Sequence, residues 1–291
     1  MRIAVHGKEF NRQSAPFIIR VFEALSSYKA EILVSEKFSR FLTAPAFKKL
    51  KLKTFDIGDS LKKVDALISI GGDGTLLDSV THIGKQEIPV LGINTGRLGF
   101  LATNSKEEAE QAVMKVCEGA YTLDMRSVLR LETNKDVFGD LNFALNDVTI
   151  VKKDSSSMIT IHTYIDGEFL NSYWADGIIV ATPTGSTGYS LSCGGPLIFP
   201  RSENFVITPV SPHNLTVRPI VVADGSEITF GVEGRSKKFL ISLDSRVASV
   251  DATIKLKVSK ADFKVNLIQL EGQHYFKTLR QKLNWGLDIR N

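Results

Sequence analysis

The segment 66–80, ALISIGGDGTLLDSV, places a carboxylate inside a glycine turn. An apolar, strand-like run leads into the motif GGDGT at 71–75, and a helix-like pattern follows it. Glycine lets the backbone approach phosphate oxygens, and a helix start supplies unpaired N–H groups. A carboxylate beside phosphate is unfavourable unless it binds Mg²⁺ or accepts a proton from an attacking hydroxyl. The motif therefore favours phosphoryl transfer, whereas an isolated Asp-Gly pair would indicate only a tight turn.

The residues after the turn predict a helix start and exclude two common phosphate-binding motifs. Thr75 and Asp78 have the spacing of a capping box, which predicts a helix that starts immediately after the turn. No Gly-Lys-Ser/Thr follows, as in a Walker A loop, and the glycine spacing is not that of the dinucleotide fingerprint GxGxxG. A dehydrogenase is therefore disfavoured.

A second dense region, DGIIVATPTGSTGYSLSCGGP, spans 176–196. A short apolar strand at 178–181 leads into a loop rich in hydroxyls and glycine, which suits recognition of ribose and phosphate. The ring of Tyr189 can stack on a base. A Ser/Thr/Gly-rich stretch is as often an ordinary surface loop, but the apolar flanks and Pro183 argue against a flexible linker.

The hydrophobic pattern predicts two domains. Up to about residue 124, predicted strands alternate with predicted helices, which is typical of a parallel sheet covered by helices. The strands are expected at 2–5, 31–34, 64–70 and 89–94, and the helices at 17–25 and 109–116. From about Met125 closely spaced β runs predict an all-β domain. These runs cover 144–151, 158–165, 177–181, 228–232, 239–243 and 253–258.

A helix over 276–283 is expected to return to the first domain. The fold class is therefore an α/β N-terminal domain with a parallel sheet, plus an all-β C-terminal domain. We place the first domain at 1–124, with the tail 268–291 packing back on it, and the β-rich domain at 125–267.

Composition excludes several classes of function. The chain has 291 residues, 43% of them hydrophobic, and no apolar run approaches the ~18 residues that span a membrane. The net charge of +4 comes from scattered Lys and Arg, so no nucleic-acid partner is expected. Cys117 and Cys193 lie far apart, which favours a cytoplasmic location, and the five histidines lack ligand spacing, so no zinc or iron site is assigned.

Several motifs, in this order, resemble signatures of the NAD kinase family. They are GGDGT at 71–75, GINTGRLGFL at 92–101, LND at 145–147, the block at 175–196, RPIV at 218–221 and the tail at 276–286. The GGDGT turn alone is not specific, because diacylglycerol-kinase-like lipid kinases and 6-phosphofructokinases use similar turns. The long glycine–threonine block is highly specific, and the resemblance covers essentially the whole chain.

The resemblance implies transfer of the terminal phosphoryl group of ATP to the 2′-hydroxyl of the adenosine ribose of NAD, which gives NADP. It implies Mg²⁺ or another divalent cation, carried with ATP, and a homodimer or homotetramer with the β domains in contact. In this reading Asp73 is the general base. The NAD-binding positions are Asp73, Gly74, Phe100, Asn146, Asp147, Trp174, Asp176, Thr187, Gly188, Tyr189, Ser190, Leu191 and Ser192. The ATP phosphates are assigned to Gly71, Gly72, Gly74, Thr75 and Arg97.

The resemblance also assigns roles within this set. Asn146 and Asp147 match an Asn-acidic pair that grips ribose hydroxyls, and Asp176 matches an acidic residue near the nicotinamide end. The loop 187–192 would enclose the adenosine half, and Phe100 resembles an aromatic wall of the site. From the residues alone, the pair at 146–147 could instead form an Asx turn at a strand end. By the same standard, Arg97 could be a solvated side chain, and Phe100 and Trp174 could belong to the core.

The chain departs from the family pattern at four places. Gly188 stands where many relatives carry alanine, and Asp147 is shorter than the glutamate often found there. Trp174 replaces a commonly basic residue and cannot supply a charge to a phosphate. The turn 243–246, Leu-Asp-Ser-Arg, stands where relatives often show Asp-Gly-Gln, which puts a contact from that turn, including Arg246, in doubt. Two other functions stay open: a lipid or sugar kinase that shares the GGDGT turn, and a non-catalytic NAD(P)-sensing module.

Overall fold

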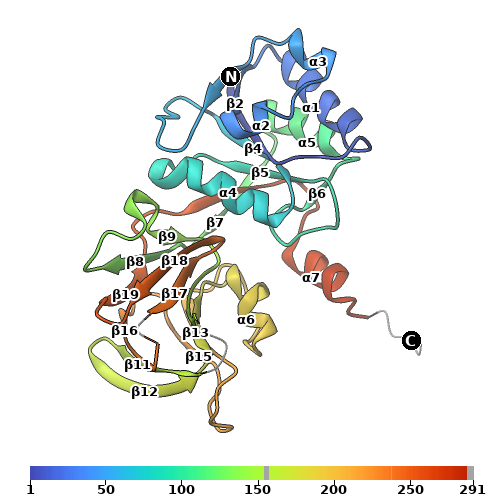
Figure 1. Cartoon of the computed structure of the whole chain (residues 1–291). Coiled ribbons are helices and arrows are strands. Elements are labelled where there is room, and N and C mark those ends of the chain that lie inside the picture. Colours follow the sequence, from blue (N-terminus) through green and yellow to red (C-terminus); the bar gives the residue numbers. More distant parts are fainter. Residues whose placement is uncertain (154–156, 237, 287–291) are drawn as a thin grey trace. The chain divides into compact units, whose positions relative to one another are not determined.

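The protein, described here from a computed structural model, divides into two compact units (Figure 1). The structure describes residues 1–153, 157–236 and 238–286. The α/β unit comprises Met1–Met125 and Val265–Asn291, and the β unit comprises Arg126–Lys264. The predicted boundaries, after residues 124 and 267, lie close to these limits.

The α/β unit is built on an eight-stranded sheet with the order β3-β2-β1-β4-β5-β20-β7, and β6 pairs with β5. The strands are β1 (Arg2–Gly7), β2 (Glu31–Ser35), β3 (Lys53–Phe55), β4 (Ala66–Gly71), β5 (Val90–Asn94), β6 (Asn104–Ser105), β7 (Thr122–Arg126) and β20 (Val265–Gln269). The helices are α1 (Ala15–Ser27), α2 (Glu36–Ser39), α3 (Pro45–Lys48), α4 (Asp73–Ile83), α5 (Ala109–Cys117) and α7 (Tyr275–Leu283). The pairings of β1 with β2 and β4, and of β4 with β5, are parallel, as predicted.

Successive residues of a strand point to opposite faces of the sheet, and apolar residues lie on both faces of these strands, so helices cover both faces. Val5 and Ile68, paired across β1 and β4, join a core that includes residues of α1 and α5. The neighbouring row on the other face includes Gly92, and a side chain at this position would collide with Leu76 of α4. The helix that follows the glycine turn therefore packs directly on the central strands.

The strand order of the sheet reverses between β1 and β4. From β1 the order runs outward to β2 and β3 on one side and to β4 and β5 on the other. In such doubly wound sheets, ligands bind outside the carboxyl ends of the strands at the point where the order reverses. β4 ends at Gly71 at this point, so the GGDGT turn lies where sheets of this type bind ligands.

The β unit consists of two six-stranded antiparallel sheets that enclose one core. One sheet holds β15 (Ile220–Ala223), β14 (Asn204–Val210), β13 (Gly177–Ala181), β10 (Asp147–Lys152), β17 (Lys238–Leu243) and β18 (Arg246–Asp251). The other holds β12 (Glu168–Ala175), β11 (Ile159–Ile165), β16 (Ile228–Glu233), β19 (Leu256–Lys260), β8 (Leu129–Thr133) and β9 (Phe143–Ala144). One short helix, α6 (Tyr189–Ser192), follows β13.

The all-β character of this region is confirmed, but two predicted strands differ in extent. The run at 144–151 divides into β9 and β10, separated at Leu145 and Asn146. The strand predicted at 253–258 begins only at Leu256, because the carboxylate of Asp251 accepts the N–H of Thr253 at 2.9 Å and forms a turn there.

Candidate active site

Asp73 is held by three successive backbone N–H groups. Its Oδ2 accepts the N–H of Phe100 at 2.7 Å, and its Oδ1 accepts those of Leu101 at 3.0 Å and Ala102 at 2.9 Å. A carboxylate offers about four lone-pair positions, and the three N–H groups occupy three of them. Asp73 is half-buried at the start of α4, and the clamp fixes both the carboxylate and the turn that carries Phe100.

The glycines around Asp73 fall into two groups. A side-chain carbon at Gly99 would lie 1.9 Å from Asp73 Oδ1, and one at Gly71 would lie 2.2 Å from the Thr75 hydroxyl. These two glycines are therefore required by the protein itself. A side-chain carbon at Gly72 or Gly74 would meet nothing within 4 Å. No neighbour in the described chain explains these two glycines, whereas the close approach of a ligand would.

The predicted capping box is wrong. α4 begins at Asp73, with Gly72 as its N-cap and no side-chain hydrogen bond to the cap. Thr75 is buried against Gly71, and Asp78 pairs instead with Lys8 at 2.7 Å. The N–H of Thr75 donates to the Gly72 carbonyl at 2.9 Å, so the N–H groups at this helix start that have no helical acceptor are those of Asp73 and Gly74.

A second cluster forms in the β unit where three strands have their ends at one edge. Asp147, at the start of β10, lies opposite Ala181, the last residue of β13, and the next residue of β10 lies opposite Leu243, the last of β17. The loop after β13 is bound to the turn before β10, since Thr182 donates its N–H to the Asn146 carbonyl at 2.9 Å and its hydroxyl to the Leu145 carbonyl at 2.6 Å.

Asp244 holds this turn in the same way that Asp73 holds the turn at Phe100. Its carboxylate accepts the N–H groups of Leu145 at 2.9 Å, Asn146 at 2.7 Å and Asp147 at 3.3 Å. Its side chain is only 5% exposed, and Arg246 lies 3.8 Å away. The turn at 243–246 therefore holds the turn before β10 through Asp244, and Arg246 in addition donates to the carbonyls of Leu141 and Phe143.

Asn146 has a side-chain oxygen without a partner among the described residues, and Asp147 has a raised pKa. Among the described residues, Asn146 Oδ1 is buried and has no hydrogen-bond partner. Burial and, to a smaller extent, the neighbouring Asp244 carboxylate together raise the pKa of Asp147 to about 7, while the Thr149 hydroxyl, which donates at 2.9 Å, opposes the rise. Burial likewise raises the pKa of Asp244. Such orphaned and perturbed groups are typical of binding sites.

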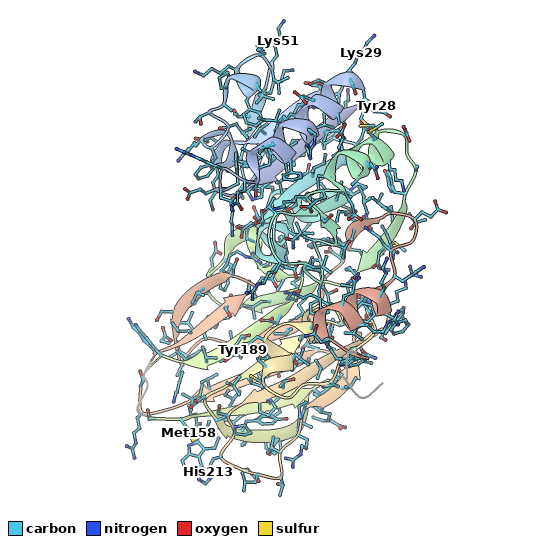
Figure 2. All side chains as sticks on the ribbon, turned by 90° about the vertical axis from the view of Figure 1, so that its right-hand side faces the viewer. Tyr28, Lys29, Lys51, Met158, Tyr189 and His213 are labelled. Atoms are coloured by element: carbon cyan, nitrogen blue, oxygen red, sulfur yellow. The ribbon has the colours of Figure 1, made fainter. Side chains whose placement is uncertain are left out.

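The loop 182–192 is ordered by its own hydroxyls. Ser190 is fully buried and shares a hydrogen bond of 2.8 Å with Thr208, and Thr187 donates to the Thr184 carbonyl at 3.1 Å. Tyr189, labelled in Figure 2, is 45% exposed, so its ring is open to a ligand. A side-chain carbon at Gly188 would lie 3.2 Å from the Gly185 carbonyl, so the alanine of many relatives would be tight in this loop.

Asp176, Trp174 and Arg97 make contacts other than those of the Asp73 and Asp244 clamps. Asp176 precedes β13 at the end opposite to Ala181, roughly 17 Å away for five residues of extended strand. It pairs with Lys152 at 2.6 Å. Trp174 is 51% exposed and stacks on His213 with ring centres 4.3 Å apart, which excludes a core position. Arg97 is exposed, and its carbonyl accepts the Asn94 side chain at 2.7 Å.

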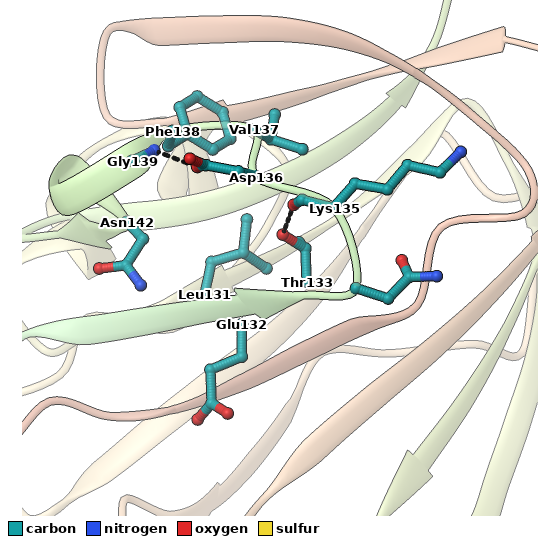
Figure 3. A pocket seen from close by; sticks show the side chains of 10 residues that line it. Leu131, Glu132, Thr133, Lys135, Asp136, Val137, Phe138, Gly139 and Asn142 are labelled. Atoms are coloured by element: carbon teal, nitrogen blue, oxygen red, sulfur yellow. Dashed lines mark hydrogen bonds between the residues drawn. The ribbon is translucent and has the colours of Figure 1, made fainter.

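A pocket of about 380 Å³ lies beside β8 and the loop that follows it (Figure 3). Residues 131–139 and Asn142 line it, and the loop is shaped by the Asp136 carboxylate, which accepts the Gly139 N–H at 2.8 Å. None of the predicted site residues lines this pocket, so it does not bear on the chemistry above.

The residues that the structure describes contain no group of three or more His, Cys, Asp or Glu side chains that could hold a metal ion. They also include no helix that is long and apolar enough to cross a membrane.

Comparison with known proteins agrees with this geometry. Residues 3–121 match the ATP-NAD kinase N-terminal domain, and residues 145–270 match the ATP-NAD kinase C-terminal domain. An NAD kinase of Cytophaga hutchinsonii is 54% identical over the full length of both chains. The NADH kinase of yeast, solved with NADH, shares the fold with a TM-score of 0.88 at 24% identity, covering 100% of this chain and 89% of that one. An NAD kinase of Archaeoglobus fulgidus, solved with ATP, has a TM-score of 0.72 at 26% identity over 98% of this chain and 99% of that one.

The fold and the two clusters define the class, a two-domain nucleotide kinase with a parallel α/β unit and an antiparallel β unit. The chain belongs to the NAD kinase family. Sequence reasoning missed Asp244 as a clamp, and it also missed Arg126, whose buried guanidinium donates to the Thr184 hydroxyl at 3.0 Å. The only signal for Asp244 was the unusual turn that contains it.

Proposed function

We propose that this protein transfers the terminal phosphoryl group of ATP to the 2′-hydroxyl of the adenosine ribose of NAD. The observation that carries the proposal is full-length similarity to NAD kinases together with an intact Asp73 at the start of α4. In this proposal the N–H groups of Asp73 and Gly74 at the start of α4 bind donor phosphate, and Gly72 and Gly74 leave room for its approach. Positioning and charge stabilisation supply most of the rate, because phosphoryl transfer needs little covalent help from the protein.

Asp73 is the proposed general base. Three of its lone-pair positions are taken by backbone N–H groups, so the carboxylate is fixed and the remaining position accepts the proton of the attacking hydroxyl. Asn146 and Asp147 are the proposed ligands of the ribose, since the unpartnered Asn146 Oδ1 can accept from a hydroxyl. The loop 187–192, with the exposed ring of Tyr189, is the proposed binding region for the adenosine half of NAD.

The divalent cation is proposed to arrive with ATP rather than on a site built by the protein alone. Mg²⁺ in kinases is commonly held by substrate phosphates with only one or two carboxylates. When bound, it would neutralise charge on the transferred group. Since the described residues hold no larger cluster of ligands, the phosphates would supply much of its coordination.

A coupled assay tests the activity. The purified chain, with ATP and Mg²⁺, should convert NAD to a product that an NADP-specific dehydrogenase reduces, and NADH and polyphosphate are tested as alternative acceptor and donor. Binding of NAD without turnover would instead indicate a sensing module, and transfer of labelled phosphate to diacylglycerol would indicate a lipid kinase.

The role of Asp73 is tested by Asp73→Asn with Asp78→Asn as its matched control. Loss of a general base should lower kcat by about 10²- to 10⁴-fold. Asparagine also places an amide N–H against the backbone donors of the clamp, so the free energy of unfolding of Asp73→Asn is measured alongside kcat. Asp78→Asn removes a carboxylate of the same helix that pairs with Lys8 and takes no part in the clamp, so it should retain most turnover. Full activity of Asp73→Asn, or equal losses in both variants, would contradict the assignment.

We also propose a cytoplasmic homodimer or homotetramer that associates through the β unit. Two observations support these proposals: Cys117 and Cys193 are free thiols, and the β unit exposes large apolar side chains, including Phe169, Trp174 and Leu215. Light scattering on the purified chain measures the mass directly, and a monomer at micromolar concentration would contradict the assembly.

A further inference from the structure

Lys282 lies over the ring of Phe100, in the same α/β unit as Asp73. Its Nζ is 5.5 Å from the ring centre, and the backbone N–H of Phe100 donates to Asp73 Oδ2 at 2.7 Å. One residue therefore links the lysine to the carboxylate that follows the glycine turn. The cation is held by an aromatic face, a contact that positions charge without neutralising it.

The side chain of Lys282 is on the inward face of its helix. α7 buries Leu279, three residues earlier, and half-buries Tyr275, seven residues earlier. Positions separated by three, four and seven residues share one face of a helix. Lys277 and Arg280, by contrast, are exposed. A lysine on an inward face normally has an acidic partner, and within the described part of the chain no ion pair forms for Lys282.

α7 is fixed to the same loop by a second contact. Gln273, two residues before α7, donates its side-chain N–H to Asn104 Oδ1 at 2.7 Å, and Asn104 in turn donates to the Gly92 carbonyl at 2.9 Å. The segment that carries Lys282 is thus attached to both ends of the turn 100–104, and Asp73 holds the middle of it. The ammonium group is consequently held beside the turn whose backbone contacts Asp73.

We propose that Lys282 binds the di- or triphosphate group of a nucleotide substrate. This inference rests on the proposed function. Asp73 brings a negative charge to a site that must also accept phosphate, so a cation on the same loop would offset the repulsion. The ammonium group keeps its three donors for phosphate oxygens because the aromatic ring takes none of them in a conventional hydrogen bond. A purely structural role, in which Lys282 interacts only with the negative end of the helix dipole of α7, explains the charge of the side chain but not its inward position.

Three full-length variants test the proposal: Lys282→Met, Lys282→Arg and Lys277→Met. Methionine keeps the apolar packing on Phe100 and removes the charge. Lys282→Met should raise KM for ATP or for NAD by about 10- to 100-fold, as expected for a lost charge-assisted contact, and the affected substrate identifies the phosphate group bound. Arginine should restore most of the affinity, and Lys277→Met should behave as the unmodified chain.

Calorimetric titration with ATP and with NAD gives a readout independent of turnover. If the unmodified chain makes no NADP, the proposed function fails, while weakened binding of either nucleotide to Lys282→Met still supports the inference. The inference is overturned if both KM values and both binding constants of Lys282→Met stay within twofold of the unmodified chain. It is equally overturned if Lys282→Arg is as impaired as Lys282→Met, because charge would then not be the cause.

Discussion

Replacing Asp147 with asparagine should stabilise this protein at neutral and basic pH. The carboxylate is buried beside Asp244, and its pKa in the folded chain is about 7, against an ordinary value of 3.8. Between these two values the folded state binds a proton that the unfolded state has lost. Stability is therefore lost as the pH rises from about 4 to about 7, and the loss is complete above pH 7.

The magnitude follows from the difference of about three pKa units, each equivalent to about 1.4 kcal/mol. The full penalty at pH 8 is thus about 4 kcal/mol, and Asp147→Asn removes it. Asparagine has nearly the same shape, and its oxygen can still accept the Thr149 hydroxyl, so little else should change. At pH 4 the two proteins should have nearly equal free energies of unfolding.

Urea unfolding at pH 5, 6, 7 and 8 gives the free energy of unfolding of both proteins, and the effect is the difference between their slopes against pH. The exposed Asp140→Asn serves as a control for removal of one negative charge. KM for NAD is measured alongside. Because Asp147 is a proposed ribose ligand, removal of its charge should make the protein more stable and weaken its affinity for NAD. The reasoning fails if Asp147→Asn is less stable than the unmodified chain at pH 8, or if both show the same pH dependence.

Two further substitutions test the glycine turn and the second clamp. Gly74→Ala should raise the free energy of unfolding by up to about 1 kcal/mol, because alanine favours a helix and meets no neighbour here. It should also cut NADP formation at least tenfold if phosphate approaches this backbone; unchanged turnover in the assay would exclude that approach. Asp244→Asn should lower stability by about 1–3 kcal/mol and reduce kcat/KM for NAD, since an amide cannot accept all three N–H groups. Urea midpoints and NADP kinetics equal to those of the unmodified chain would show that the clamp is dispensable.

The parts of the fold that periodicity governs were predictable from sequence. Short apolar runs alternating with amphipathic helices define β1, β4 and β5 and the helices that cover them, because burial on both faces of a parallel sheet leaves few other patterns. Ends of elements were less predictable. The Thr75–Asp78 spacing suggested a cap, but packing of Thr75 against Gly71 and the Lys8–Asp78 pair use these side chains otherwise.

The site was predictable only where its residues are contiguous. The GGDGT turn and the loop 182–192 stand out because glycine and hydroxyls gather within a few positions. Asp244 does not, because its partners are backbone N–H groups 97 to 99 positions away. They meet only through the pairing of β10 with β17, where Val148 lies opposite Leu243. A single acidic residue in a hairpin turn carries no sign of that pairing.

Asp73 and Asp244 make the same pattern of hydrogen bonds, but their carboxylates differ in solvent exposure. Each carboxylate accepts three consecutive backbone N–H groups and so fixes a turn that bears a proposed substrate ligand. Asp244 follows the last residue of β17 and its side chain is only 5% exposed, so we expect it to affect substrate through the turn it holds. Asp73 is half-buried at the start of α4, where no side chain caps the helix. The same hydrogen-bond pattern therefore positions a turn in the β unit, and in the α/β unit it holds the carboxylate that we propose as the general base.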